Sequence, residues 1–223
     1  MAKLLLISGS LRGGSTNSAT LRTAAALAPA GIEAEIYDGM GRLPHFNPDD
    51  DPADGVGLDA EVAALRAALT DADALLLSTP EYAGALPGSF KNLLDWTVGG
   101  GQTDNMPVAW LNVSGAAAPS GGTDAHDSLR KVLGYTGAVI VEAACLRLPL
   151  ARDDVGKHGL VAPPETREAI VAAMTTLAAA ADCQEIFGGG PAFISEIGPV
   201  IGAHVGPGLI GIGAISWSLL DAG

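Results

Sequence analysis

The chain has 223 residues, of which 48% are hydrophobic and 17% are charged, so it can build a full core and is not wholly disordered. Twelve lysines and arginines stand against 25 aspartates and glutamates, giving a net charge of −13 without a basic tract. Binding to nucleic acid or to an anionic membrane is therefore not expected. Two cysteines outside any C-x-x-C spacing, no signal-peptide pattern and no long apolar run predict a reduced, cytoplasmic protein without a membrane span.

Short apolar runs alternate with longer amphipathic segments through most of the chain. The runs predict strands at 3–8, 33–38, 73–79, 107–114 and 138–145, and the segments between them predict helices at 16–30, 57–70, 88–98, 124–135 and 163–182. Because most of these strands are continuously apolar, both faces of their sheet must be covered, which favours an α/β fold with a doubly wound parallel sheet of five strands. Such sheets bind ligands beyond the carboxyl ends of their strands.

Residues 183–223 break this alternation. The segment is rich in glycine and proline, which exclude a long regular helix, yet it is apolar rather than linker-like. We therefore divide the chain into a domain over 1–182 and a C-terminal extension over 183–223.

The loop after the first predicted strand reads S-G-S-L-R-G-G-S-T-N from residue 8 to residue 17, directly before a helix. Its glycines allow backbone N–H groups to approach an anion, and the helix N-terminus adds unpaired donors. Side-chain donors come from Ser10, Arg12, Ser15, Thr16 and Asn17. This arrangement indicates a phosphate site, although a glycine-rich turn with Ser15 as a helix cap explains the same residues.

The loop after the third predicted strand begins T-P-E-Y-A-G-A-L-P-G at residue 79. Its prolines stiffen the backbone and its glycines allow tight turns. A stiff loop with a tyrosine suits the face and polar edge of a flat heterocycle, so we expect ligand contacts from Pro80, Glu81, Tyr82, Ala83 and Gly84. The alternative is a simple turn before a core-facing helix.

Three segments together resemble one family. G-S-L-R-G-G-S-T-N at 9–17 is similar to the G-S-x-R-x-x-S-x-N motif of NAD(P)H-dependent FMN reductases. The segment 79–96, T-P-E-Y-A-G-A-L-P-G-S-F-K-N-L-L-D-W, resembles the P-E-Y…K-N-x-L-D-W signature of that family, and L-P-H-F-N-P-D-D-D at 43–51 resembles its loop after the second strand. The resemblance covers about residues 1–180.

The resemblance implies a flavodoxin-like fold with FMN at the strand ends and NADPH or NADH as co-substrate. It places Ser10, Arg12, Ser15 and Asn17 around the FMN phosphate, and Pro80, Glu81, Tyr82 and Gly84 along the flavin ring. Much of the ring contact in the family comes from backbone groups, so no catalytic side chain is expected. The family passes two electrons from NAD(P)H to free flavin, a quinone, an azo compound or a metal oxyanion, and it forms homodimers or homotetramers.

The loop after the fourth predicted strand, S-G-A-A-A-P-S-G-G-T-D-A from residue 114, resembles the third flavin-edge loop of the family. Ser114, Gly115 and Gly121 are the candidates there, and a flexible connection is the alternative. His126, just beyond, is interpreted as a surface or capping residue, and Cys145 as a small hydrophobic residue. No histidine pair has metal-ligand spacing, so no metal site is predicted.

Two other functions stay open. A non-enzymatic electron carrier of the flavodoxin type fits the fold, but the S-x-R-x-x-S-x-N loop argues against it. The tail at 193–213 resembles the C-terminal segment of DegV-type fatty-acid-binding proteins, with G-P-V-I-G-A-H-V-G-P-G at its centre. A lipid-binding or interaction role through this tail is the second alternative.

Overall fold

The structure is a computed structural model that describes residues 1–187 apart from residues 54 and 116–117. Most of the predicted C-terminal extension, including its DegV-like segment, lies outside the described residues. The strands are β1 (Ala2–Ser8), β2 (Ile32–Tyr37), β3 (Ala74–Ser78), β4 (Pro107–Asn112), β5 (Val139–Ile140) and β6 (Leu146–Arg147). The helices are α1 (Thr16–Ala26), α2 (Ala60–Thr70), α3 (Gly88–Asp95), α4 (Thr123–Tyr135) and α5 (Pro164–Phe187).

The strands form one parallel sheet in the order β2-β1-β3-β4-β5, and β6 pairs with β4. This is the doubly wound order of flavodoxin-like folds, so the predicted fold class is confirmed. The order reverses at β1, because the chain first adds β2 on one side and then β3 on the other. The loops after β1 and β3 therefore begin next to each other.

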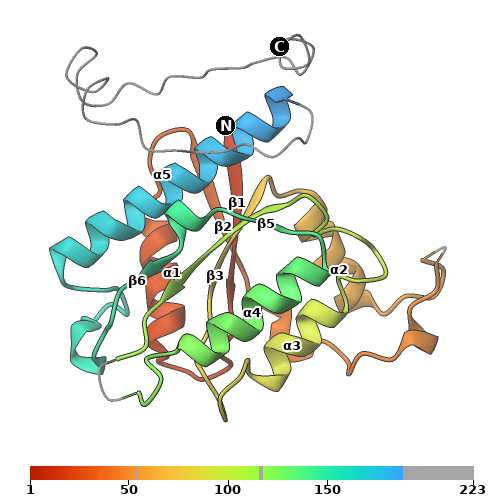
Figure 1. The fold of residues 1–223 in the computed structure, drawn as a ribbon, viewed down its shortest axis with the longest axis horizontal. Coiled ribbons are helices and arrows are strands. Elements are labelled where there is room, and N and C mark those ends of the chain that lie inside the picture. The colour runs from red at the N-terminus through yellow and green to blue at the C-terminus, as the bar shows by residue number, and fades with distance from the viewer. Residues whose placement is uncertain (54, 116–117, 188–223) are drawn as a thin grey trace, which may run out of the picture. The chain divides into compact units, whose positions relative to one another are not determined.

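Alternate side chains of the strands enter two separate cores, one on each face of the sheet. Leu4 and Leu6 of β1 pack with apolar residues of α1 and α5. Leu5 and Ile7 pack with α2, α3 and α4 on the opposite face. The two layers of helices, visible in Figure 1, explain why the strand sequences are continuously apolar. No helix within the described ranges is both long and apolar enough to cross a membrane.

The predicted fifth strand over 138–145 is wrong as a single element. β5 and β6 both pair with β4, but a 3₁₀ turn over Glu142–Ala144 separates them. Val108 of β4 pairs with Ile140, and Leu111 of β4 pairs with Leu146. The edge chain therefore has more residues between these two pairs than β4 has, and the turn bulges out of the ladder. In the sequence only Glu142 interrupts this run, because the other residues of the turn, Ala143 and Ala144, are apolar like the strands.

Helix ends differ from the prediction where local chemistry sets them. Helix α1 ends at Ala26 rather than residue 30, ahead of Pro29. Helix α2 begins at Ala60 rather than residue 57, because the Asp59 carboxylate accepts a 2.8 Å hydrogen bond from the Glu61 N–H and caps the helix. Helix α5 continues to Phe187, past the predicted end.

The long segment after β2 is fastened to α2 and α3. The carbonyl oxygen of Pro44 accepts hydrogen bonds from Asn92 Nδ2 and Trp96 Nε1, both at 2.9 Å. Farther along, Asp51 forms a 2.8 Å ion pair with Arg66, and their side chains are only 7% and 12% exposed. Arg66 also donates to the Trp96 carbonyl oxygen. Asn92 and Trp96 of the K-N-L-L-D-W segment therefore hold a neighbouring loop in place.

Candidate functional site

The carboxyl ends of β1, β3 and β4 bring three loops to one edge of the sheet. Ser8 lies beside Ser78 in the ladder, and the Gly9 N–H donates a 2.8 Å hydrogen bond to the Ser78 carbonyl oxygen. Gly9 must be glycine here, because a Cβ at this position would lie 2.2 Å from Thr79 Oγ1. The loops predicted from sequence to bind one ligand therefore start from adjacent strand ends.

The loop after β1 leaves an uncompensated positive end on α1. Ser15 occupies the N-cap position, but its side chain forms no capping hydrogen bond, and the first turn contains no acidic residue. Arg12, Gly13 and Gly14 are exposed, and the Arg12 guanidinium forms no hydrogen bond or ion pair within the described residues. Free helix N–H groups beside an unpaired arginine and an uncommitted serine hydroxyl fit a phosphate group.

Two more predicted residues of this loop, Ser10 and Asn17, have structural contacts. Ser10 Oγ accepts a 3.3 Å hydrogen bond from the Arg12 N–H, which shapes the loop. Asn17 is buried, and its side-chain amide lies 2.9 Å from Ser78 Oγ, which is also 2.8 Å from the Leu111 carbonyl oxygen. The contacting atom of Asn17 is Oδ1, an acceptor like the Leu111 carbonyl oxygen, and because a hydroxyl has one proton, Ser78 donates to one of these two oxygens at a time.

The loop after β3 contains a tight two-residue turn. Tyr82 and Ala85 exchange backbone hydrogen bonds of 3.0 and 3.1 Å, and the residues between them have positive φ angles, 52° at Ala83 and 71° at Gly84. Both central residues of a type I′ turn have this conformation, which explains the glycine. The turn leaves Tyr82 53% exposed, so its ring is available to a ligand or another chain.

Glu81 joins the loop after β3 to the loop after β4. Its Oε2 accepts a hydrogen bond from the Ser120 hydroxyl and a 3.3 Å hydrogen bond from the Ala125 N–H in the first turn of α4. A carboxylate there satisfies an otherwise unpaired helix donor and faces the positive end of the helix dipole. This side chain therefore fastens two loops together.

The loop after β4 folds around Asn112. Asn112 Nδ2 donates to the Gly121 carbonyl oxygen at 2.9 Å, and its Oδ1 accepts from the Ser114 N–H at 3.0 Å. Gly121 has a φ of 63° and Gly122 a φ of 82°, and a Cβ on Gly122 would lie 2.4 Å from Ser114 Oγ. Gly115 packs toward the Leu150 carbonyl oxygen. The described part of this loop is thus built by specific contacts.

His126 is not the surface or capping residue that the sequence predicts. It is 7% exposed, its ring lies 5.8 Å from that of Trp110, and its Nδ1 lies 2.6 Å from the Gly122 carbonyl oxygen. A carbonyl oxygen only accepts, so Nδ1 carries the proton, and the buried Nε2 has no hydrogen-bond partner. Burial lowers the pKa of His126. The helical spacing of Leu129 and Leu133 from His126 was the signal for a buried stripe.

Cys145 follows the expectation of a small hydrophobic residue. Burial raises the pKa of its thiol to about 12, so the reactive thiolate is not populated at neutral pH. Among the residues that the structure describes, no group of three or more His, Cys, Asp or Glu side chains could hold a metal ion.

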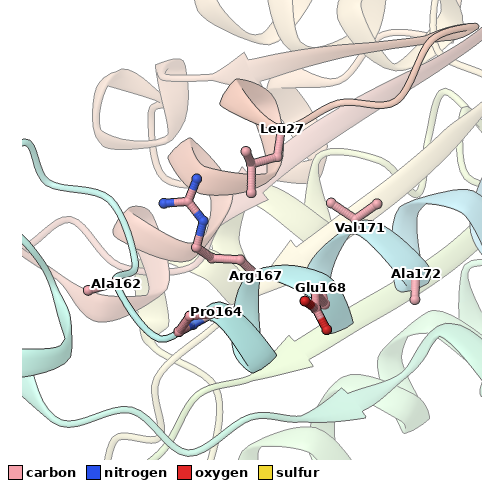
Figure 2. Close-up of a pocket in the computed structure, with 7 residues that line it drawn as sticks. All are labelled: Leu27, Ala162, Pro164, Arg167, Glu168, Val171 and Ala172. Atoms are coloured by element: carbon pink, nitrogen blue, oxygen red, sulfur yellow. The ribbon is translucent and has the colours of Figure 1, made fainter.

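A hollow of about 710 Å³ lies away from the three loops, between the end of α1 and the first turns of α5 (Figure 2). Its lining is mostly aliphatic, with Arg167 and Glu168 as the charged side chains. None of its residues belongs to the three loops, so it is not part of the candidate site.

We expect Glu81→Ala to lower the free energy of unfolding by about 1–3 kcal/mol, because it leaves the Ser120 hydroxyl and the Ala125 N–H without their acceptor. Glu81→Gln keeps an acceptor oxygen and should lose less. Urea unfolding measures both, with Glu168→Ala on α5 as a matched control. Equal stability of the Glu81→Ala variant and the wild type would show that the two loops are not joined through this carboxylate.

Protonation of His126 should destabilise the fold in mild acid. Its pKa is lowered in the folded chain, so the unfolded chain binds the proton more tightly, and stability falls as the pH drops below the ordinary histidine value of 6.5. Urea unfolding at about pH 7.5 and about pH 5.5 should show a larger loss for the wild type than for His126→Gln. The exposed His158→Gln serves as the control, and equal losses in wild type and His126→Gln would contradict the assignment.

Comparison with known proteins agrees with this arrangement. The family model for NADPH-dependent FMN reductases matches residues 2–153. An NAD(P)H-dependent FMN reductase of Pseudomonas aeruginosa is 44% identical over 94 residues, which cover 42% of this chain and about half (49%) of that protein. A 2-hydroxy-1,4-benzoquinone reductase of a Burkholderia species is 30% identical over 185 residues, covering 79% of this chain and 94% of the relative.

Solved structures share the fold. The flavoenzyme NAD(P)H:(acceptor) oxidoreductase FerB of Paracoccus denitrificans superposes with a TM-score of 0.65 at 23% identity, covering 82% of this chain and 98% of its own. A flavodoxin, WrbA-like protein of Agrobacterium tumefaciens superposes with a TM-score of 0.54 at 15% identity, covering 82% and 99%. The family model matches most of the described chain, and the three loops of this chain meet at one edge of the sheet. The chain therefore belongs to the NADPH-dependent FMN reductase family.

Proposed function

We propose that this chain is an NAD(P)H-dependent FMN oxidoreductase that delivers two electrons to a small-molecule acceptor. One observation carries the proposal: three loops meet at one edge of the sheet. The loop after β1 has unpaired donors suited to an anion, the loop after β3 forms a tight turn, and the loop after β4 is rich in glycine. Bound FMN would supply the redox chemistry, by taking two electrons from NAD(P)H and passing them to the acceptor. Free flavin, a quinone, an azo compound or a metal oxyanion is the proposed acceptor class.

The residues of the chain would bind and orient the flavin. Arg12, Ser15, Thr16 and the N-terminus of α1 would hold its phosphate, with Ser10 and Asn17 shaping the loop around it. Pro80 and the turn at Ala83–Gly84 would present backbone groups to the ring, and Ser114, Gly115 and Gly121 would approach its other edge. Glu81, which joins the loop after β3 to the loop after β4, would keep these two loops in a fixed position relative to each other.

Assembly into a dimer or tetramer is part of the proposal. Leu11 is 60% exposed and Tyr82 is 53% exposed, and both lie in loops of the candidate site. Exposed apolar side chains at the mouth of a site support contact with a second subunit or with a flat substrate.

The visible spectrum of the purified protein tests the function. After reconstitution with FMN and desalting, the flavin bands should remain, and NADPH or NADH should bleach them under argon. Retained flavin that neither nucleotide bleaches would favour the electron-carrier alternative. If no flavin remains and the protein catalyses no NAD(P)H-dependent reduction of added FMN, the proposed function fails.

Arg12→Ala should weaken FMN binding by about 1.5–3 kcal/mol, the scale of a charge-assisted hydrogen bond. Quenching of flavin fluorescence during titration of the apoprotein measures the change. Riboflavin, which has no phosphate, should bind the variant and the wild type equally, and Arg152→Ala, an exposed arginine elsewhere, should bind FMN normally. Undiminished FMN affinity in the Arg12 variant would remove Arg12 from the phosphate site.

A further inference from the structure

A second polar pocket adjoins the loop after β4. It measures about 200 Å³, and its polar lining consists of Asn112, Thr123, His126, Asp127, Arg130 and Arg147. Pockets for whole drug-sized ligands are about 300–1,000 Å³, so this one suits one part of a ligand rather than a whole flavin or dinucleotide. Asn112 also shapes the flavin-edge loop by holding Gly121, so the pocket shares a wall with the candidate flavin site.

Arg147 gives this pocket an unpaired positive charge. It ends β6 beside Asn112 in the ladder, and its guanidinium lies so close to Gly121 that a Cβ there would be 2.3 Å from Nη2. The side chain is exposed and forms no hydrogen bond or ion pair within the described residues. A guanidinium held over a glycine of the flavin-edge loop can donate two parallel hydrogen bonds to an oxyanion.

The rest of the wall is polar, and its other charged groups leave Arg147 as the free positive charge of the pocket within the described residues. Arg130 lies 5.1 Å from the centre of the Trp110 ring and pairs with Glu142 on the bulge between β5 and β6. Because Glu142 balances the charge of Arg130, Arg147 is the arginine of this lining without an ion pair within the described residues, and Asp127 is the acidic lining residue. His126 contributes a buried ring whose Nε2 has no partner, and because Nδ1 carries the proton, Nε2 can only accept a hydrogen bond, so it suits a hydroxyl or N–H group of the ligand beside the anionic group.

We propose that this pocket is an oxyanion subsite, which binds a phosphate or carboxylate carried by one of the substrates while the rest of that substrate lies over the flavin. The inference rests on the proposed function, since it places the subsite beside a flavin. The two sources of such a group are the 2′-phosphate that distinguishes NADPH from NADH and an anionic substituent on the acceptor. Arg147 is the principal ligand in both cases.

Steady-state kinetics of Arg147→Gln with NADPH and NADH test the proposal in the FMN-loaded protein. If the group is the 2′-phosphate, KM for NADPH should rise about tenfold or more, the scale of a charge-assisted hydrogen bond, and far more than KM for NADH. If it belongs to the acceptor, KM should rise for a carboxylated quinone and not for an uncharged one. Arg152→Gln, which removes an exposed charge elsewhere, should change neither, and Arg147→Lys should restore part of the loss.

A binding measurement separates failure of this inference from failure of the proposed function. Calorimetry with 2′,5′-ADP and with 5′-ADP needs no turnover, and a quinone carboxylate can be titrated in the same way. Weaker binding of any phosphate or carboxylate probe to Arg147→Gln than to Arg152→Gln supports the subsite even in a protein that does not oxidise NAD(P)H. Unchanged KM values together with unchanged affinities for all these probes would overturn it.

Discussion

Ser78, at the end of the central strand β3, joins the four elements on which the site depends. Its carbonyl oxygen accepts the Gly9 N–H from the end of β1, and its hydroxyl lies between the side chain of Asn17 on α1 and the carbonyl oxygen of Leu111 on β4. All of these contacts are buried, where a lost partner is costly because water cannot replace it. One small polar residue thus places the start of each candidate binding loop relative to the others.

Several polar side chains near the candidate site hold loops in place and are not needed for the reaction itself. Glu81 ties the turn after β3 to α4, Asn112 closes the loop after β4, and Asn92 with Trp96 fastens the segment after β2 through Pro44. Loops have little intrinsic order, so a site made of backbone donors needs such fastenings to keep its geometry. This division of labour suits an enzyme whose cofactor performs the reaction.

The two predicted loops of greatest interest were recognisable because local physics governs them. A glycine-rich stretch between a strand and a helix predicts exposed donors whatever lies elsewhere, and the side chains of Arg12 and Ser15 form no hydrogen bond within the described residues. Glu81 and Asn17 belong to the same motifs, yet their partners are 44 and 61 residues away along the chain. No local pattern indicates which motif residues contact a ligand and which hold the loop.

The sequence by itself determined the order of strands and helices along the chain, the coverage of the sheet on both faces and the positions of the candidate binding loops, because periodicity and turn chemistry act over a few residues. Only the tertiary structure decided the bulge that separates β5 from β6, the burial of His126 against Trp110 and the placing of Arg147 over Gly121. The bulge and the position of Arg147 depend on how the edge of the sheet registers with β4, and the burial of His126 depends on how α4 packs on β4. That register follows from packing between distant segments, which no short stretch of sequence encodes.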